Sequence, residues 1–320
     1  MVGNMANFIE QPVPTMYFFG VTTGESLSRR MFPAWAEILK LGDARLVGVD
    51  LPLDGSREQY RQAVYQIKAD RNSLGAVVTT HKIRVLRAAA DYFDELTADA
   101  ELCGEVSSIY KRNGRLIGHT VDPETSGKAM KAFIPADHWT RHRSDILCLG
   151  AGGSAVALVT FFCTRSAPNQ RPRRMILVNR GQEKLDNLAE LLRRLPESGI
   201  AFDLVRNSDP AVNDGLMAEL PPHSLVINAT GMGKDIPGSP VTDRGLFPEH
   251  GLVWELNYRG KLDFLHQARA QEAARGLHVE DGWTYFLLGW SEIVGAVFDK
   301  PIDQPVFERL AGEATRMRDR

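Results

Sequence analysis

Short apolar runs alternate with amphipathic stretches of helical length through the first third of the chain. An apolar run of four to six residues is typical of a buried strand, whereas apolar residues three and four apart indicate a helix with one buried face. This alternation predicts parallel α/β structure. The predicted strands are Met16–Val21, Leu46–Leu51 and Gly75–Val78, and the helices between and after them are Met31–Leu41, Glu58–Ala69 and Ile83–Ala90.

A β-hairpin is expected next, because two strand-like segments, Val106–Tyr110 and Arg115–Gly118, flank an Asn113-Gly114 turn. Asn and Gly tolerate the positive φ angles that such turns require. The stretch Pro135–Ser144 then interrupts the apolar pattern and is interpreted as the connection between two domains.

A second α/β unit follows, and two amphipathic segments without a strand after them close the chain. We expect these closing helices to pack back against the rest of the chain. The predicted ranges are 1–135 for the first α/β domain, 136–282 for the second α/β domain and 283–320 for the C-terminal helices. The strands of the second unit are Ile146–Leu149, Met175–Val178, Phe202–Val205, Leu225–Ile227 and Leu252–Trp254, and its helices include Val156–Thr164, Lys184–Leu195 and Phe264–Ala274, with Trp283–Phe298 and Val306–Met317 as the closing helices.

Composition is that of an ordinary globular protein, with 320 residues, 43% hydrophobic and 24% charged. A formal net charge of −2 gives no long-range field for nucleic acid or an anionic membrane, so a small-molecule partner is expected, for a monomer or a homodimer.

Cys103, Cys148 and Cys163 share no close pair, which favours reduced thiols, and no metal site is indicated. Met1–Pro14 lacks the pattern of a secretory signal, and no apolar run approaches the ~20 residues of a membrane span, so we expect a cytoplasmic protein.

The strongest local motif opens the second domain, where Gly150-Ala151-Gly152-Gly153-Ser154-Ala155 follows a predicted strand and precedes a predicted helix. This order fits the G-x-G-x-x-A pattern of dinucleotide-binding folds. Gly150 can adopt the tight turn, Gly152 lets the backbone approach a pyrophosphate, and Ala155 permits close packing of helix on strand. The helix N-terminus adds unpaired N–H groups. The alternative is a glycine-rich turn that only joins a strand to a helix.

Cofactor choice is decided after the next strand, which ends in Asn179-Arg180-Gly181, with Lys184 one turn later. An acid there would hold the ribose hydroxyls of NAD, whereas Arg180 and Lys184 suit the 2′-phosphate of NADP. NADP is therefore favoured, with NAD as the alternative, unless both cations are ordinary solvated charges. Asn228-Ala229-Thr230 ends a further strand at the edge where a bound cofactor would pass, although a simple turn from strand to helix would look the same.

Several motifs occur in a recognisable order: Ser26-Leu27-Ser28, Lys82, Gly104-Glu105-Val106-Ser107-Ser108, Gly118–Asp122, the Gly150 turn, Asn179-Arg180, Asn228-Ala229-Thr230 and Tyr258. In this order they resemble the shikimate dehydrogenases over roughly residues 17–297. The resemblance implies an N-terminal α/β domain that binds substrate, a Rossmann-like doubly wound second domain that binds NAD(P), and a reaction in the cleft between them, with C-terminal helices that return to the first domain. It also implies that Lys82 and Asp122 form the catalytic pair.

Such a pair suits ketone reduction, because hydride addition leaves an alkoxide that a nearby ammonium can stabilise and protonate. Without the resemblance, Lys82 and Asp122 would each be interpreted as a solvated surface charge. Ser26 and Ser28 lie two residues apart, so they can both donate to a substrate carboxylate, or one of them can cap the following helix. Tyr258 corresponds to a tyrosine in the family's cleft, or it is a buried tyrosine with a satisfied hydroxyl.

Departures from the family pattern predict a changed substrate. Where the family reads Asn-Val-Thr-x-Pro-x-Lys, this chain has Ala76-Val77-Val78-Thr79-Thr80-His81-Lys82, and a late glutamine is replaced by Gly289. The family's Ala-Val-Asn-Thr becomes Glu105-Val106-Ser107-Ser108. Each unmade buried hydrogen bond costs about 1–3 kcal/mol, so shikimate itself is not the expected substrate. Thr79 and Ser107 are candidate contacts for a different ring.

Glu105 adds an acid that could meet an amino group, but the preferred interpretation is that it points to solvent. The predicted function is reversible hydride transfer between nicotinamide and a ring alcohol or ketone of a small cyclic hydroxy acid or cyclitol. The alternative is a non-catalytic regulator that binds a metabolite or a dinucleotide on the same scaffold.

Overall fold

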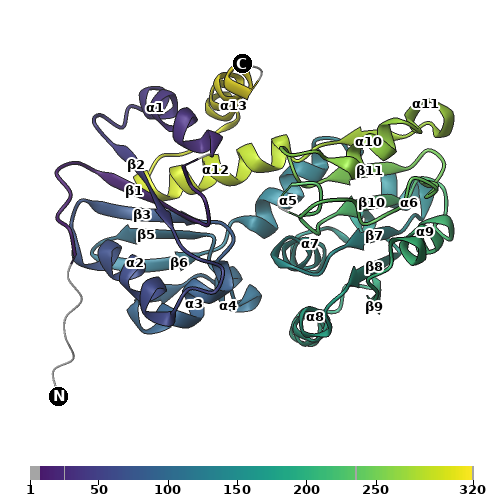
Figure 1. Ribbon diagram of the computed structural model, residues 1–320, viewed down its shortest axis with the longest axis horizontal. Coiled ribbons are helices and arrows are strands. Elements are labelled where there is room, and N and C mark those ends of the chain that lie inside the picture. Colours follow the sequence, from purple (N-terminus) through teal and green to yellow (C-terminus); the bar gives the residue numbers. More distant parts are fainter. Residues whose placement is uncertain (1–7, 25, 235, 319–320) are drawn as a thin grey trace. The chain divides into compact units, whose positions relative to one another are not determined.

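The computed structural model describes residues 8–24, 26–234 and 236–318. The chain forms two compact units (Figure 1). Unit 1 comprises Met1–Val121 and Leu287–Arg320, and unit 2 comprises Asp122–Phe286. Residues 1–7, half of the N-terminal segment from which a secretory signal was excluded, lie outside the described part of the chain.

Unit 1 is built on a six-stranded sheet with the order β2-β1-β3-β5-β6-β4. The first three strands are parallel, as the alternating pattern predicts, but β5 pairs antiparallel with β3 and β6, so the sheet is mixed. Asn113 and Gly114 both have positive φ, which confirms the predicted hairpin turn. The strands are β1 Thr15–Gly20, β2 Arg45–Asp50, β3 Ser73–Val78, β4 Glu95–Leu96, β5 Ser108–Arg112 and β6 Arg115–His119.

Helices cover both faces of this sheet because its strand residues alternate between two apolar layers. Tyr17 and Phe19 face a core that includes Val64 of α2 and Val85 of α3. On the other face, Phe18 packs edge-to-face on Trp290, with 5.2 Å between ring centroids. The helices of this part are α1 Leu27–Leu39, α2 Arg57–Ala69, α3 Lys82–Ala89 and α4 Ala98–Cys103, with the 3-10 turn η1 Ala90–Tyr92.

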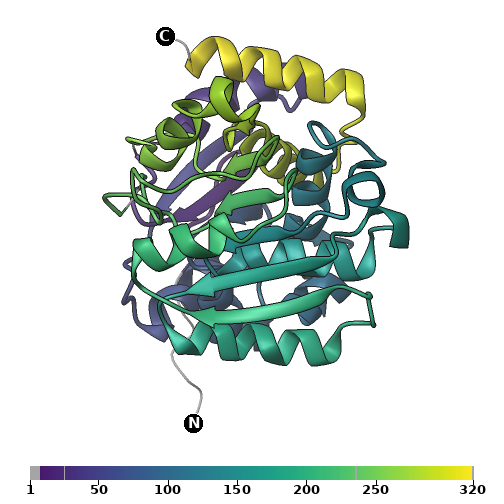
Figure 2. The same ribbon diagram turned by 90° about the vertical axis from the view of Figure 1, so that its right-hand side faces the viewer.

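Unit 2 contains a second six-stranded sheet with the order β12-β11-β10-β7-β8-β9 (Figure 2). All strand pairings among its described residues are parallel. If β7 to β12 are numbered 1 to 6 and the sheet is followed from β9 to β12, the order is 3-2-1-4-5-6, which is that of dinucleotide-binding folds. The strand order reverses between β7 and β10. The strands are β7 Ile146–Leu149, β8 Arg174–Asn179, β9 Ala201–Arg206, β10 Leu225–Asn228, β11 Leu252–Glu255 and β12 His278–Glu280.

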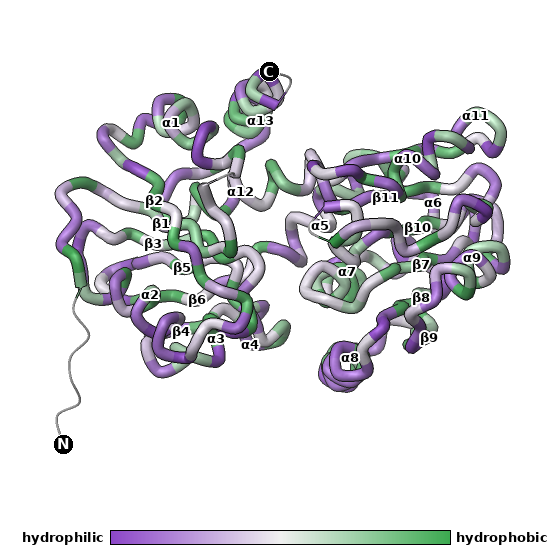
Figure 3. The backbone as a smooth tube through the Cα atoms, viewed as in Figure 1, coloured by the Kyte–Doolittle hydropathy of each residue, from purple (hydrophilic) through white to green (hydrophobic). Residues whose placement is uncertain are grey.

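Most helices of unit 2 lie between its strands along the chain, and a helix with few apolar residues buries few side chains. Helix α8 buries only three leucines, and its tube is coloured mostly hydrophilic in Figure 3. Residues 135–144, expected to form an irregular connection, include helix α6, and the expected single helix at 264–274 is two helices, α10 and α11. The helices are α5 Asp122–Lys131, α6 His138–His142, α7 Gly153–Thr164, α8 Gln182–Arg194, α9 Pro210–Ala218, α10 Asp263–Arg269 and α11 Glu272–Arg275, with the 3-10 turn η2 Pro168–Gln170.

The chain closes with α12 Trp283–Phe298 and α13 Gln304–Arg318. Residues from Leu287 onward belong to unit 1, where the Trp35 indole of α1 donates to the Leu310 carbonyl of α13 at 3.0 Å. The closing helices therefore return to the first unit. The predicted fold class is confirmed: an N-terminal α/β unit, a Rossmann-like doubly wound unit and C-terminal helices that pack on the first.

Candidate functional site

The glycine turn after β7 has a backbone that only glycine can supply at its first position. Gly150 has φ +118°, and a Cβ built on it would lie 2.5 Å from the Ala229 carbonyl oxygen. Two 2.7 Å hydrogen bonds hold the turn, from Gly150 N–H to the Val178 carbonyl and from Ala229 N–H to the Leu149 carbonyl. The missing side chain thus allows the ends of β7 and β10 to meet where the strand order reverses, which is where open α/β sheets bind ligands.

A cavity of about 210 Å³ opens at this edge of the sheet. Eight of the predicted cofactor residues line it: Gly150, Ala151, Gly152, Asn179, Arg180, Lys184, Ala229 and Thr230. Gly153 and Ser154 instead begin helix α7, whose N-cap is Gly152. The ends of β7, β8, β9 and β10 and the N-terminus of α7 thus surround one cavity.

Charge at this cavity is positive. Its lining includes Arg180 and Lys184, and the described residues that line it include no carboxylate. The Lys184 ammonium nitrogen lies 3.8 Å from the position of a Cβ built on Gly152, so it stands directly beside the glycine turn. Asn179 is fixed by a 2.8 Å hydrogen bond from its amide nitrogen to the Gly181 carbonyl. An anion with several oxygens fits this arrangement of cations and amide groups.

Asn228 lies behind the cavity rather than in its lining. It is fully buried, and its amide nitrogen donates to a Glu255 carboxylate oxygen at 2.6 Å. Its amide oxygen accepts from the Thr230 hydroxyl at 2.6 Å and from the Thr230 N–H at 3.1 Å. Asn228 therefore shapes the loop after β10 and presents Ala229 and Thr230 to the cavity.

Glu255, at the end of β11, is the buried acid of this network, and the sequence patterns did not identify it as a site residue. Its other carboxylate oxygen accepts from the Asn257 N–H at 2.8 Å and from the Asn257 amide nitrogen at 2.6 Å. Burial raises the pKa of Glu255 to about 7, although the hydrogen bonds from Asn257 and Asn228 act in the opposite direction. Near neutral pH this carboxyl group thus exists in both protonation states.

Asn207, Ser208 and Asn213 also line the cavity and were missed by the sequence patterns. They follow β9 or belong to α9, and Asn213 is held by a 2.8 Å hydrogen bond from its amide nitrogen to the Pro240 carbonyl. The signal that could have found the first two was available, because they come directly after a predicted strand in a parallel sheet. Residues at that edge line ligand sites in such folds.

In unit 1, Lys82 is the first residue of α3, and its partly exposed side chain lies beside Glu105. The Nζ–Oε1 distance is 3.9 Å, and the Glu105 side chain is only 3% exposed. The preferred expectation that Glu105 points to solvent is therefore wrong. Its backbone explains the burial, because hydrogen bonds from Glu105 N–H to Ala100 and from Val106 N–H to Lys82 turn this segment inward.

The predicted substrate-binding serines and threonine of unit 1 have local partners. Ser26 caps α1, and its hydroxyl lies 2.7 Å from the Ser28 hydroxyl, so the capping alternative is realised. The Thr79 hydroxyl donates to the Phe19 carbonyl at 3.1 Å. Ser107 is buried and accepts from the Val121 N–H at 3.0 Å. The Ser26–Ser28 pair keeps one O–H that can donate to a ligand.

Asp122 and Tyr258 belong to unit 2. Asp122 begins α5, is 8% exposed, and accepts a 3.4 Å hydrogen bond from the Tyr285 hydroxyl. Partial positive charge at a helix N-terminus stabilises such a carboxylate. Tyr258 stacks on Phe286, with 4.1 Å between ring centroids. Because Lys82 lies in unit 1 and Asp122 in unit 2, their pairing remains a prediction.

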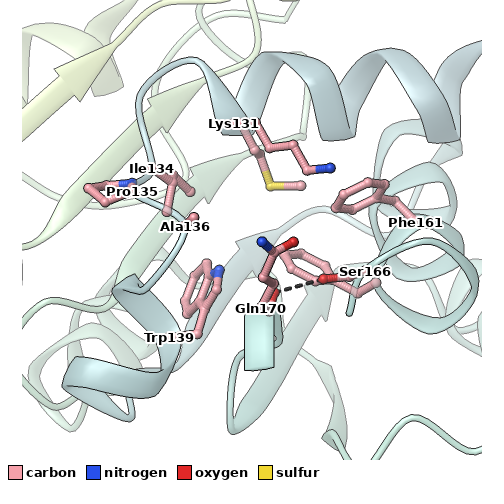
Figure 4. A pocket seen from close by; sticks show the side chains of 10 residues that line it. Lys131, Ile134, Pro135, Ala136, Trp139, Phe161, Ser166 and Gln170 are labelled. Atoms are coloured by element: carbon pink, nitrogen blue, oxygen red, sulfur yellow. Dashed lines mark hydrogen bonds between the residues drawn. The ribbon is translucent and has the colours of Figure 1, made fainter. Parts of the chain in front are cut away.

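A different cavity of unit 2, about 250 Å³ in volume, contains none of the predicted site residues (Figure 4). Its walls are mainly apolar, and Lys131, Ser166 and Gln170 are its polar members. It lies beside the C-terminal ends of α5 and α7, whereas the glycine turn precedes the N-terminus of α7.

Among the described residues no group of three or more metal-binding side chains is found, and no described helix is long and apolar enough to cross a membrane.

Comparison with known proteins finds proteins of similar sequence and fold, although no protein-family model matches the chain. The chain is 30% identical over 184 residues to the shikimate dehydrogenase (NADP(+)) of Lactococcus lactis, covering 57% of this chain and 60% of the relative. A relative of the same name from Exiguobacterium is 27% identical over 226 residues, covering 69% of this chain and 74% of the relative. The chain spans about 60% of the length of the first curated relatives that it matches.

Over these regions the chain is similar in sequence to shikimate dehydrogenases, at 27–30% identity.

Solved structures show a similar fold. Shikimate 5-dehydrogenase from Thermus thermophilus, solved with NADP(H) and shikimate, aligns with a TM-score of 0.68 at 24% identity, covering 95% of this chain and 99% of that one. The 5-ketofructose reductase of a Gluconobacter strain aligns with a TM-score of 0.67 at 19% identity, covering 95% and 98%. The shikimate dehydrogenase fold is thus shared with a protein named for a different substrate.

Proposed function

We propose that this chain is an NADP-dependent oxidoreductase that interconverts a ring alcohol and a ketone of a small cyclic hydroxy acid or cyclitol. The observation that carries the proposal is the cavity at the strand-order reversal of unit 2, with two cations and no carboxylate among its described lining residues. The bound nicotinamide would supply or accept the hydride. The curated relatives named shikimate dehydrogenase (NADP(+)) support this choice of reaction and cofactor.

Preference for NADP over NAD follows from the two cations. The Arg180 guanidinium offers a planar fork of donors to a 2′-phosphate, and Lys184 adds a point charge beside the glycine turn. The turn itself, with Gly152 as the N-cap of α7, would receive the pyrophosphate. NAD, which lacks the 2′-phosphate, would lose only the contacts with these two side chains.

Lys82 is the proposed proton partner of the reacting oxygen. Its ammonium would stabilise the developing alkoxide and deliver a proton when the ketone is reduced, and its neutral amine would accept that proton in the reverse direction. Asp122 would orient the ammonium and hold the reacting hydroxyl. Ser26 and Ser28 would donate to a substrate carboxylate, with Thr79, Ser107 and Tyr258 near the ring.

The substrate we propose is not shikimate. Ala76 and Val78 stand where the family has an asparagine and a threonine, and both are buried apolar residues of β3. Ser107 stands where the family has an asparagine, and its shorter side chain is bonded to the Val121 backbone and to the Thr120 hydroxyl, so it would not reach the ring hydroxyl that the longer amide would contact. We propose that a ring with other substituents fits this altered set, and the 5-ketofructose reductase neighbour, which shares the fold and is named for a different substrate, supports this proposal.

The test is a screen of shikimate, quinate-like acids and aminocyclitols with NADP, followed by the absorbance of reduced nicotinamide. We expect turnover of at least one non-shikimate compound, lost by more than a hundredfold in Lys82→Ala while NADP binding is unchanged. Lys261→Ala, which changes an exposed lysine, is the matched control. Unaltered turnover in Lys82→Ala contradicts the assigned role, efficient turnover of shikimate contradicts the substrate proposal, and NADP binding with no turnover of any compound indicates a regulator.

Cofactor preference is tested separately on helix α8 and the turn before it. Arg180→Ala and Lys184→Ala should each weaken NADP binding about tenfold and leave NAD binding within twofold, because each removes a contact to the 2′-phosphate. Arg193→Ala, at the exposed far end of the same helix, is the control. Equal losses for NADP and NAD would mean that these cations hold the pyrophosphate instead.

A further inference from the structure

Glu105 is a buried acid next to the proposed proton donor, and the family resemblance does not account for it. Its side chain is 3% exposed and lies 3.9 Å from the Lys82 ammonium nitrogen. The distance is too long for a direct hydrogen bond but is within the range of a strong charge interaction. The position corresponds to an alanine in the family pattern, so this chain has added a carboxylate where its relatives carry a methyl group.

A carboxylate at this depth needs a cation. Transfer of an ionised carboxyl from water into a protein interior costs several kcal/mol unless an opposite charge or hydrogen bonds compensate. Lys82 is that cation, and the backbone fixes the geometry, because the Val106 N–H donates to the Lys82 carbonyl at 3.4 Å. Residues 104–106 and the first turn of α3 are thus joined both through the backbone and by charge.

We propose that Glu105 is a positioning residue for Lys82, which keeps its side chain in the ammonium form and directs it. The inference rests on the proposed function, in which Lys82 gives its proton to the reacting oxygen. A carboxylate within ~4–6 Å favours the charged form of an amine, so Glu105 extends to higher pH the range in which Lys82 can act as an acid. The chain is thereby suited to ketone reduction.

The experiment measures the protonation of Lys82 without any need for substrate. The full chain is labelled by competitive acetylation with acetic anhydride across a pH series, and the extent of labelling at Lys82 is read by mass spectrometry. Only the neutral amine reacts, so the labelling midpoint reports its titration. The variants are Glu105→Gln, which keeps the shape and removes the charge, and Glu105→Ala, which restores the residue of the family pattern. Glu101→Gln, an exposed acid on α4, is the control.

We expect the Lys82 midpoint to fall by about one pH unit, a tenfold loss of proton affinity, in both Glu105 variants and not in Glu101→Gln. Asp122, which is proposed to orient the Lys82 ammonium, and the titratable groups of α3 and α4 and their caps, among them His81, Arg84, Asp99 and Cys103, are the same in all variants, so the difference reports Glu105. For a ketone substrate found in the screen, the alkaline limb of the reduction rate should move down by the same amount.

An unchanged midpoint in both Glu105 variants overturns the inference, whatever Lys82→Ala does. A shifted midpoint with an unshifted rate profile also overturns it, because the charge then has no part in proton delivery. If the midpoint shifts and Lys82→Ala retains full turnover, the ion pair is real but the proposed function is wrong, so the two failures are distinguishable.

Discussion

Replacing Gly150 by alanine should damage unit 2 far more than replacing Gly152, although both belong to the same motif. At Gly150 the added Cβ would lie 2.5 Å from the Ala229 carbonyl oxygen, and the φ of +118° is strained for any L residue. Backbone strain of this kind costs about 1–3 kcal/mol, and displacing Ala229 weakens the 2.7 Å hydrogen bond from its N–H to the Leu149 carbonyl, which joins β7 to β10. We expect a loss of about 3–5 kcal/mol in the free energy of unfolding of unit 2, a large fraction of a typical domain's stability.

At Gly152 the backbone is extended, and the nearest atom to an added Cβ is the Lys184 ammonium nitrogen at 3.8 Å. Gly152→Ala should therefore fold with nearly unchanged stability and instead weaken NADP binding by tenfold or more, because the methyl group occupies the approach of the pyrophosphate. We thus expect Gly150 to be needed for the stability of the fold and Gly152 to be needed for binding of the pyrophosphate.

Urea denaturation followed by circular dichroism measures the stability difference, and titration with NADP measures binding. Gly215→Ala is the control, since it lies within α9 with nothing within 4 Å of the added Cβ and should stabilise by up to ~1 kcal/mol. The reasoning is refuted if Gly150→Ala unfolds at the same urea concentration as the unsubstituted chain, or if Gly152→Ala binds NADP equally well.

Three further outcomes follow from other contacts. Burial raises the pKa of Glu255 to about 7, so the stability that its protonated form contributes is fully present below about pH 4.5 and is lost as the pH rises through 7. Glu255→Gln should remove about 3 kcal/mol of this pH dependence, measured by urea denaturation as a difference from the unsubstituted chain. Gly127→Ala should destabilise unit 2 by about 2 kcal/mol or more, because its Cβ would lie 2.1 Å from the Phe161 ring; a neutral effect in thermal unfolding would show that the ring moves aside freely. Trp35→Phe should cost about 1–2 kcal/mol by losing the hydrogen bond to Leu310, and an unchanged melting temperature would contradict the role given to that bond.

Much of the fold could be predicted from local pattern because parallel strands are buried on both faces. Such strands appear in the sequence as continuous apolar runs, and β7 was located to the residue from Ile146–Leu149. The hairpin turn was likewise predicted from Asn113-Gly114, since few residues accept positive φ. Helix α6 was missed because five residues are too few for a helical period to emerge, although its Trp139 is buried.

Eight of the residues that line the cavity at the glycine turn were also predicted from the sequence, because a glycine motif and the carboxyl ends of parallel strands have fixed positions in this kind of sheet. Residues whose role depends on distant partners were not predictable. Glu105 looks like a solvated acid after a turn, and Glu255 looks like the polar end of a strand.

The sequence by itself thus determined the two α/β units, the glycine turn and the resemblance to a family, because each is recorded within a few neighbouring residues. Only the tertiary structure decided that Glu105 is buried beside Lys82, and that Glu255 lies under the loop after β10 with Asn228 and Asn257. The physical reason is that the charge state and burial of a side chain depend on groups brought to it by folding. Those groups can lie 20 or more residues away, as Lys82 does from Glu105 and Asn228 from Glu255.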